Sequence, residues 1–285
     1  MRPYFERFVA IDWSGAKGTR HRGIAIGLCE TGTQAPRLVT APGGIWSRRA
    51  VADWLAQTAA QAPTLFGFDF SFAPPFVARG SYLPGEAVPQ DGPGFWAYVD
   101  AICDDDDLGA ASLLEQHHRR HFYFGKADGV KAAYMHNRAC EVHYNAGGGG
   151  KPSTVYDAIG AAQVAKASFA GMRLLHHLRP AVPIWPFDPL PGDGSLIVEI
   201  YTSIAARAAG RPKGRSKMRD LATLNAALMA LDCAPHDGAM PDDHGADALV
   251  TAAWMRRAST DTRLWSPAAM SDEIARTEGW TFGIF

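Results

Sequence analysis

Two short segments of the chain share one pattern of side chains. Residues 8–15 read FVAIDWSG and residues 65–72 read LFGFDFSF, so each passes from apolar residues to an aspartate, an aromatic residue and a serine. Such apolar runs predict β-strands, and Asp12 and Asp69 then stand at the strand ends. Ligands of α/β proteins bind at the carboxyl ends of strands, and a carboxylate among aromatic rings needs a hydrogen bond, a counter-charge or a metal ion. The repeat favours a functional site, although each aspartate alone is also typical of a turn cap.

The remaining apolar runs and helical spacings predict a single α/β domain over residues 1–285. Further strands are expected at residues 23–29, 37–40 and 195–201, and helices at residues 47–62, 157–178, 217–231 and 243–256. Residues 74–94 are rich in proline and glycine, which is typical of a long loop. We therefore expect residues 74–190 to form a large, mostly helical insertion between the fourth and fifth strands.

Further acidic residues join the two strand-end aspartates as candidates. Glu199 lies inside the strand segment SLIVEIY, where glutamate is unfavourable unless it faces water or serves a site. Asp243 and Asp247 are four residues apart, and His244 precedes Asp247 by three, so either spacing places the pair on one helix face. Asp243 is also typical of a helix cap. Asp247 begins an apolar stripe, and capping explains it poorly.

The motifs AIDWSG, GFDFS, VEIYTS, DDHGADAL and EGWTFGIF, in this order, resemble the DUF429 family of ribonuclease H-like nucleases. The resemblance covers both ends of the chain. It implies a mixed five-stranded sheet in the order 3-2-1-4-5, flanked by helices, and two Mg²⁺ or Mn²⁺ ions held by carboxylates. The residues that it implies for catalysis and metal binding are Asp12, Asp69, Glu199 and Asp247, with Asp243 as a further metal ligand and His244 and Glu141 as auxiliary residues.

One departure from the ribonuclease H pattern concerns the helix after the third strand. Ribonuclease H carries an acidic residue there, whereas the helix at 47–62 offers only Asp53. Glu199 or Glu141 would have to take its place. For Glu141, an ion pair with the nearby Arg138 is the simpler interpretation.

A basic segment follows the predicted fifth strand and is expected either to bind phosphates or to form an ordinary solvated surface. Its candidates for phosphate binding are Arg211, Lys213, Arg215 and Lys217. A second group contains His117 and His121, which have the i, i+4 spacing of zinc ligands. No cysteine or acidic residue lies in a recognisable partner pattern, so exposed polar histidines are the preferred interpretation.

Composition narrows the classes of function. The net charge of −1 disfavours a wholly basic nucleic-acid coat protein, and the four cysteines form no CxxC pair of a zinc ribbon. No apolar run approaches the roughly 18 residues of a membrane span, and the expected location is the cytoplasm. The preferred hypothesis is a metal-dependent nuclease acting on DNA or RNA. An ATP-dependent small-molecule kinase of actin-like fold, suggested by the segment DWSGAKGT, and a non-catalytic nucleic-acid-binding module are the alternatives. The oligomeric state is left open.

Overall fold

The computed structural model describes residues 3–150, 152–159, 164–214 and 216–285, which form an α/β protein built on a five-stranded sheet. The strands are β1 (Arg7–Asp12), β2 (Ala25–Glu30), β3 (Arg37–Leu38), β4 (Thr64–Phe68) and β5 (Leu196–Glu199). Their order is β3-β2-β1-β4-β5, which confirms the predicted class and strand order. β1 is antiparallel to β2 and parallel to β4, and β4 is parallel to β5, so the sheet is mixed.

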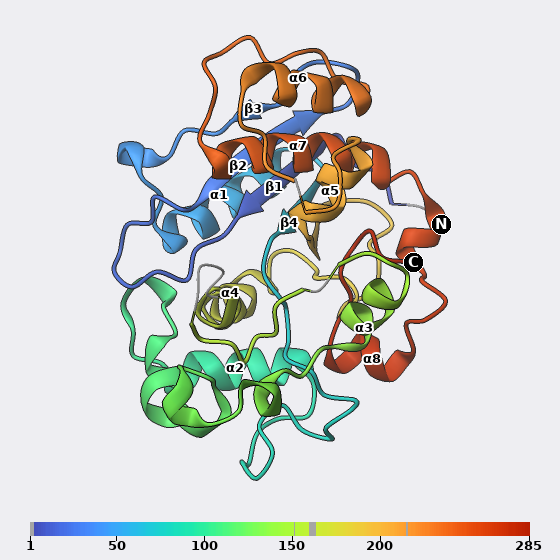
Figure 1. Ribbon diagram of the computed structural model, residues 1–285. Coiled ribbons are helices and arrows are strands. Elements are labelled where there is room, and N and C mark those ends of the chain that lie inside the picture. The colour runs from blue at the N-terminus through green and yellow to red at the C-terminus, as the bar shows by residue number, and fades with distance from the viewer. Residues whose placement is uncertain (1–2, 151, 160–163, 215) are drawn as a thin grey trace.

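Helices cover both faces of the sheet (Figure 1). The α-helices are α1 (Arg48–Gln61), α2 (Gly92–Ile102), α3 (Ala139–Ala146), α4 (Val164–Leu178), α5 (Thr202–Ala208), α6 (Leu221–Ala230), α7 (Asp243–Ala258) and α8 (Asp272–Thr277). α7 packs on β1 and β2 and contacts α5 and α6, whereas α4 contacts α1 and α2. Among the described helices, none has the length and apolar character needed to cross a membrane.

Side chains of the strands alternate between two apolar cores. Val9 and Ile11 of β1 pack into the core that contains α1, α2 and α4, whereas Phe8 and Ala10 pack into the core that contains α5, α6 and α7. Successive side chains of a strand point to opposite faces, so a sheet covered on both sides needs strands that are apolar throughout. The same alternation decides which face an acidic side chain at a strand end can reach.

The helix expected at residues 217–231 begins later, at Leu221. The reason is a cap, because the Asp220 carboxylate accepts a hydrogen bond from the backbone N–H of Thr223 at 2.7 Å. Lys217 therefore lies on the loop before α6 and not on the helix itself. This position leaves the lysine side chain free to reach α7.

The chain between β4 and β5 carries α2, α3 and α4. The helix expected at residues 157–178 is described only from Val164, since residues 160–163 lie outside the described residues. Asp157 is not helical, because it pairs with Tyr123 in an isolated β-bridge. The strand expected at 195–201 is also shorter, ending at Glu199, where the chain turns into α5.

Close packing of α7 on the sheet depends on Gly27 of β2. A Cβ atom at this position would lie 2.4 Å from the carbonyl oxygen of Ala248, inside van der Waals contact. The backbones of β2 and α7 therefore touch without an intervening side chain. Because the two backbones touch, Asp247, the residue before Ala248, lies close to the end of the sheet.

We expect Gly27→Ala to destabilise the protein by about 1–3 kcal/mol, because the added methyl must push α7 away from β2. Gly192→Ala is the control, since no atom lies within 4 Å of a Cβ built there. Urea unfolding followed by circular dichroism measures both variants. Equal midpoints for the two variants would contradict the close approach.

Candidate carboxylate site

A cavity of about 650 Å³ opens at the carboxyl ends of β1 and β4, bordered by residues of α4 and α7. Its ionisable lining residues are Asp12, Asp69, Arg138, Glu141, Glu199, Tyr201, Lys217, His244 and Asp247. The four acidic residues expected for catalysis thus line one cavity. Their environments within it differ, and this difference decides what each can do.

Asp12 and Asp69 lie side by side because β1 and β4 are parallel neighbours. Ile11 pairs with Phe68, and the backbone N–H of Asp69 donates to the carbonyl of Ile11 at 3.0 Å. Both aspartates continue the strand face that packs toward α7. The hydroxyl of Thr202, at the start of α5, donates to Asp69 at 3.0 Å. The shared sequence pattern therefore ends in two adjacent carboxylates.

α7 brings a third aspartate and a histidine to the same place. Asp242 caps the helix by accepting a backbone N–H of the first turn at 2.8 Å. One turn further, Asp247 is buried and accepts a hydrogen bond from Lys217 Nζ at 2.7 Å. His244 Nδ1 lies 3.0 Å from a carboxylate oxygen of Asp12. Two basic side chains thus contact two of the three clustered aspartates.

Crowding and burial change the proton affinity of these groups. Burial, followed by repulsion from Asp12, raises the pKa of Asp69 to about 8. Burial also raises the pKa of Asp247, and the hydrogen bond from Lys217 opposes that shift. The contact with Asp12 raises the pKa of His244. Without metal, the cluster therefore holds extra protons and cationic groups, as closely placed carboxylates require.

Glu199 differs from the expectation for a metal ligand. Its two carboxylate oxygens accept hydrogen bonds from both terminal nitrogens of Arg138, at 2.5 and 2.6 Å. They also accept from the hydroxyl of Thr281 at 2.6 Å and the backbone N–H of Phe72 at 2.8 Å. These four donors fill the roughly four acceptor positions of a carboxylate. Glu199 is therefore engaged as a structural anchor.

The alternation of β5 accounts for this difference. Glu199 follows Ile197 on the side of the sheet that faces α4, whereas Asp12 and Asp69 lie on the side of α7. Glu141 is engaged in a similar way, because it accepts hydrogen bonds from the backbone N–H of Arg138 at 2.8 Å and from its Nε at 3.0 Å. Glu141 therefore forms the local ion pair with Arg138 that was the simpler interpretation of the sequence.

The further metal ligand and the phosphate-binding residues predicted from the sequence are spread more widely. Asp243 does not line the cavity, and its side chain is 62% exposed with a carboxylate oxygen 4.0 Å from Lys217 Nζ. Lys213 donates to the carbonyl of Gly148 at 3.1 Å. Arg211 is partly buried, and Arg215 lies outside the described residues. Of the described members of the basic segment, Lys217 is the one that lines the cavity.

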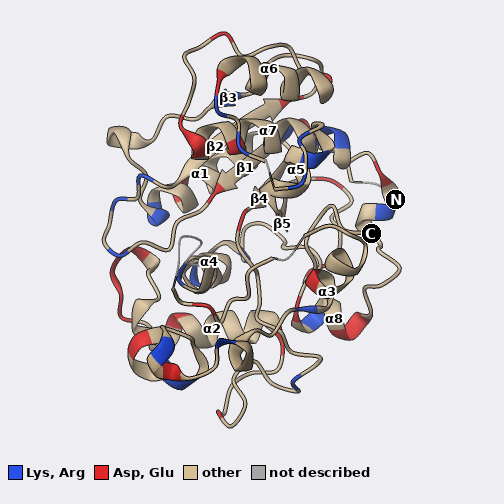
Figure 2. Cartoon of the chain, in the orientation of Figure 1, with Lys and Arg blue, Asp and Glu red and all other residues tan. Residues whose placement is uncertain are grey.

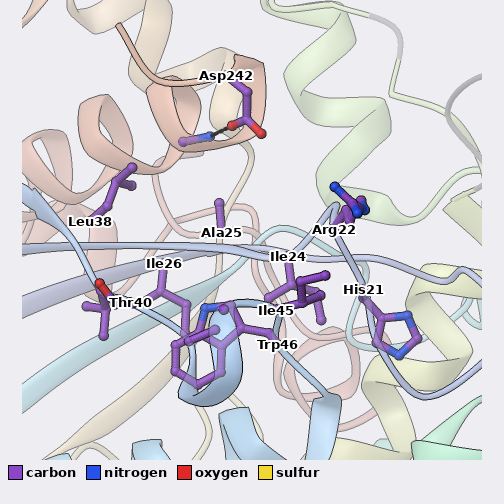
Figure 3. Close-up of a pocket in the computed structure, with 14 residues that line it drawn as sticks. His21, Arg22, Ile24, Ala25, Ile26, Leu38, Thr40, Ile45, Trp46 and Asp242 are labelled. Carbon is purple, nitrogen blue, oxygen red and sulfur yellow. Dashed lines mark hydrogen bonds between the residues drawn. The ribbon is translucent and has the colours of Figure 1, made fainter. Parts of the chain in front are cut away.

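A second cavity of about 440 Å³ lies beside β2 and β3 (Figure 3). Figure 3 shows Trp46 and Asp242 on opposite sides of it, with Leu38 at one end and His21 at the other. Asp242 is already the cap of α7, and His21 lies 2.9 Å from Asp107 in a buried pair. These two groups therefore serve structural contacts.

Sequence reasoning missed another group of ligand-type side chains. Among the described residues, Glu86, His118 and His121 are the one set of three whose ligand atoms all lie within 4.8 Å of one another. The three aspartates of the carboxylate cavity do not approach one another so closely. Histidine spacing was the available signal, but it pointed to His117, which is exposed. Glu86 comes from a distant loop that no local pattern connects to the histidines.

No family model, curated protein or solved structure matches this chain. The fold and the cavity define an α/β protein with clustered aspartates at the carboxyl end of a mixed sheet. The function must be inferred from that geometry.

In the metal-free protein, Asp69 should contribute stability that is lost as the pH rises from about 4 to about 8. Asp69 has a pKa of about 8 in the folded chain, against about 3.9 for an unfolded aspartate. Its contribution is therefore complete below the unfolded pKa and is lost as the pH rises through the folded pKa. Thermal melts of Asp69→Asn should show a flatter dependence of Tm on pH.

Asp53→Asn is the matched control, because Asp53 is exposed on α1. Its curve should run parallel to that of the wild type. A parallel curve for Asp69→Asn as well would mean that Asp69 takes up no proton on folding.

Proposed function

We propose that this chain is a ribonuclease H-like phosphodiester hydrolase that acts on nucleic acid with divalent metal ions. The observation that supports the proposal is the placement of Asp12 and Asp69 on parallel neighbouring strands, with Asp247 on the helix packed above them. In the proposed class, residues 74–190 are an insertion into the ribonuclease H-like core, and the protein works in the cytoplasm.

The donor set of the cavity fits a hard cation. Asp12, Asp69 and Asp247 offer carboxylate oxygens, which suit Mg²⁺ and Mn²⁺. Two basic groups, Lys217 and His244, contact this set, and burial together with repulsion from Asp12 raises the pKa of Asp69. These three aspartates would hold the metal, with Asp243 at the rim. Bound metal would supply activation of water and stabilisation of the leaving oxygen.

The chain's own residues would orient the phosphodiester and move protons. Lys217 Nζ reaches the cavity from the loop before α6 and, once released from Asp247, would pair with a phosphate oxygen. The imidazole of His244 is half exposed with Nδ1 on Asp12, so it would carry a proton at the cavity mouth. Glu199 and Arg138 would hold the cavity wall in place through their buried ion pair.

Nucleic acid is the proposed substrate because Lys217 lines the acidic cavity and the other residues of the basic segment directly precede it in the chain. In the view of Figure 2 the positions of acidic and basic residues are interspersed along the chain. Binding would therefore rest on a local set of phosphate contacts and not on overall charge, which is −1.

The ATP-dependent kinase of actin-like fold is the second candidate, because Ser14, Gly15 and Ala16 of its phosphate-loop-like segment line the cavity. The doubled core of that class is not evident in the described part of the chain, which has a single five-stranded sheet. Stabilisation by MgATP without cleavage of any nucleic acid would favour this kinase over the nuclease.

With Mn²⁺ or Mg²⁺, the wild type should cleave members of a panel of end-labelled DNA and RNA substrates that includes single strands, duplexes and junctions. Asp12→Asn and Asp247→Asn should each lower the rate at least about 100-fold, because loss of a metal ligand removes several kcal/mol of transition-state stabilisation. Asp53→Asn should cleave at the wild-type rate. Circular dichroism of each variant verifies folding, and cleavage by folded Asp12→Asn at the wild-type rate would refute the assignment.

Affinity for nucleic acid should fall steeply with salt. Replacing three residues of the basic segment by glutamine should flatten the slope of log K against log salt by up to about 2.7 on duplex and about 2.1 on single strands. The three residues are Arg211, Lys213 and Arg215. Fluorescence anisotropy measures the slopes.

The matched control replaces three exposed basic residues outside the basic segment by glutamine. They are Arg37, Arg49 and Lys126. An equal change of slope in both triple variants would show that the basic segment has no particular part in binding.

A further inference from the structure

Two histidines and a glutamate meet outside the carboxylate cavity. Glu86 lies in the loop between β4 and α2, whereas His118 precedes the short helical turn Arg119–His121 and His121 ends it. One oxygen of Glu86 lies 3.2 Å from His121 Nε2 and 3.6 Å from His118 Nδ1. In Figure 1 this part of the chain, blue-green to green, lies in the half of the molecule that contains α2 and α4.

These distances suit the corners of a tetrahedron. Zinc binds imidazole nitrogen and carboxylate oxygen at about 2.0–2.1 Å, so two ligand atoms of a tetrahedral site lie about 3.3–3.4 Å apart. Both contacts of Glu86 are close to that separation. The ligand atoms of all three residues lie within 4.8 Å of one another, so a small rotation of the rings would close the set.

An unpartnered nitrogen marks the centre of the group. His118 is 7% exposed, and its Nδ1 is buried without a hydrogen-bond partner in the described structure. A buried polar atom in this state is costly unless something binds it. The other ring nitrogen, Nε2, lies 2.7 Å from the hydroxyl of Tyr98. With Nε2 as the donor in this bond, Nδ1 carries a lone pair, and the hydroxyl of Tyr98 fixes the ring in the orientation that a metal-binding histidine needs.

We propose that Glu86, His118 and His121 form a site for Zn²⁺ or another divalent ion that prefers imidazole. Three protein ligands leave the fourth position to water. The metal would clip the loop that carries Glu86 to the turn that carries the histidines. This site is separate from the carboxylate cavity and does not depend on the function proposed for it.

In the metal-free protein, Arg120 supplies a positive charge beside Glu86 and His121. Its guanidinium lies 2.8 Å from the Glu86 oxygen and donates from Nε to His121 Nε2 at 3.3 Å. The Arg120 side chain is 64% exposed, so it can turn into solvent when a cation arrives. Removing this competitor should strengthen metal binding, which is the opposite of the effect expected for the ligands.

The experiment uses the full chain without an affinity tag, stripped with a chelator and titrated with Zn²⁺ by calorimetry. We expect one tightly bound equivalent at this site, with affinity lowered more than about 100-fold in Glu86→Gln and in His121→Gln. Tyr98→Phe should lower it about 10–100-fold, because the His118 ring loses the hydrogen bond that orients it. Arg120→Ala should raise it. Co²⁺ in place of Zn²⁺ should give a tetrahedral absorption spectrum that both ligand variants lose.

The control variants are His117→Ala, next to the site, and Asp12→Asn, in the carboxylate cavity, and both should keep the zinc affinity of the wild type. Far-UV circular dichroism verifies that each variant is folded, and Glu86→Gln is the mildest of the ligand changes. Absence of a saturable one-equivalent zinc site, or equal affinity in folded Glu86→Gln and wild type, would overturn the proposal. Loss of zinc in Asp12→Asn would overturn it too, because the metal would then belong to the carboxylate cavity.

Discussion

One buried guanidinium, that of Arg138, connects segments that are far apart in the chain. It is 2% exposed and binds Glu199 at the end of β5, Glu141 in α3 and the carbonyl of Glu278. The Glu278 carboxylate in turn accepts the backbone N–H of Ala139, the first residue of α3. A buried charge that loses its partner costs about 3–5 kcal/mol, so these segments are stable only together. The wall of the carboxylate cavity depends on that arrangement.

The repeated local pattern was enough to place Asp12 and Asp69 at strand ends, and the strand order implied by the family resemblance made the two strands neighbours. The same resemblance implied the strand order that the sheet has. The condition of Glu199 was not predictable in this way, since its main partner lies 61 residues away and the strand face is known only after the strand is paired. Local patterns indicate which residues lie at strand ends, but they do not indicate which distant groups bind the side chains of those residues.

The group of Glu86, His118 and His121 shows the same limit, because no local pattern indicated which distant residue joins the histidines. Glu86 and His121 are 35 residues apart and meet through two irregular segments, for which no periodicity exists. The spacing of His117 and His121 was a helical argument, but the chain leaves a π-helical turn at His117 and enters a 3₁₀ turn at Arg119. His118 lies between these two turns and is buried beside Glu86, whereas His117 is exposed.

The outer edge of β5 is completed late in the chain. Thr281 pairs with Glu199 across 82 residues, and the backbone N–H of Phe282 donates to the carbonyl of Glu199 at 2.8 Å. A ribosome adds about 5–20 residues per second, so this interval takes roughly 4–16 s of synthesis. During that time the end of β5 would be an unpaired strand edge, the kind of surface at which nascent chains associate. The last residues of the chain are therefore needed before this edge of the sheet is protected.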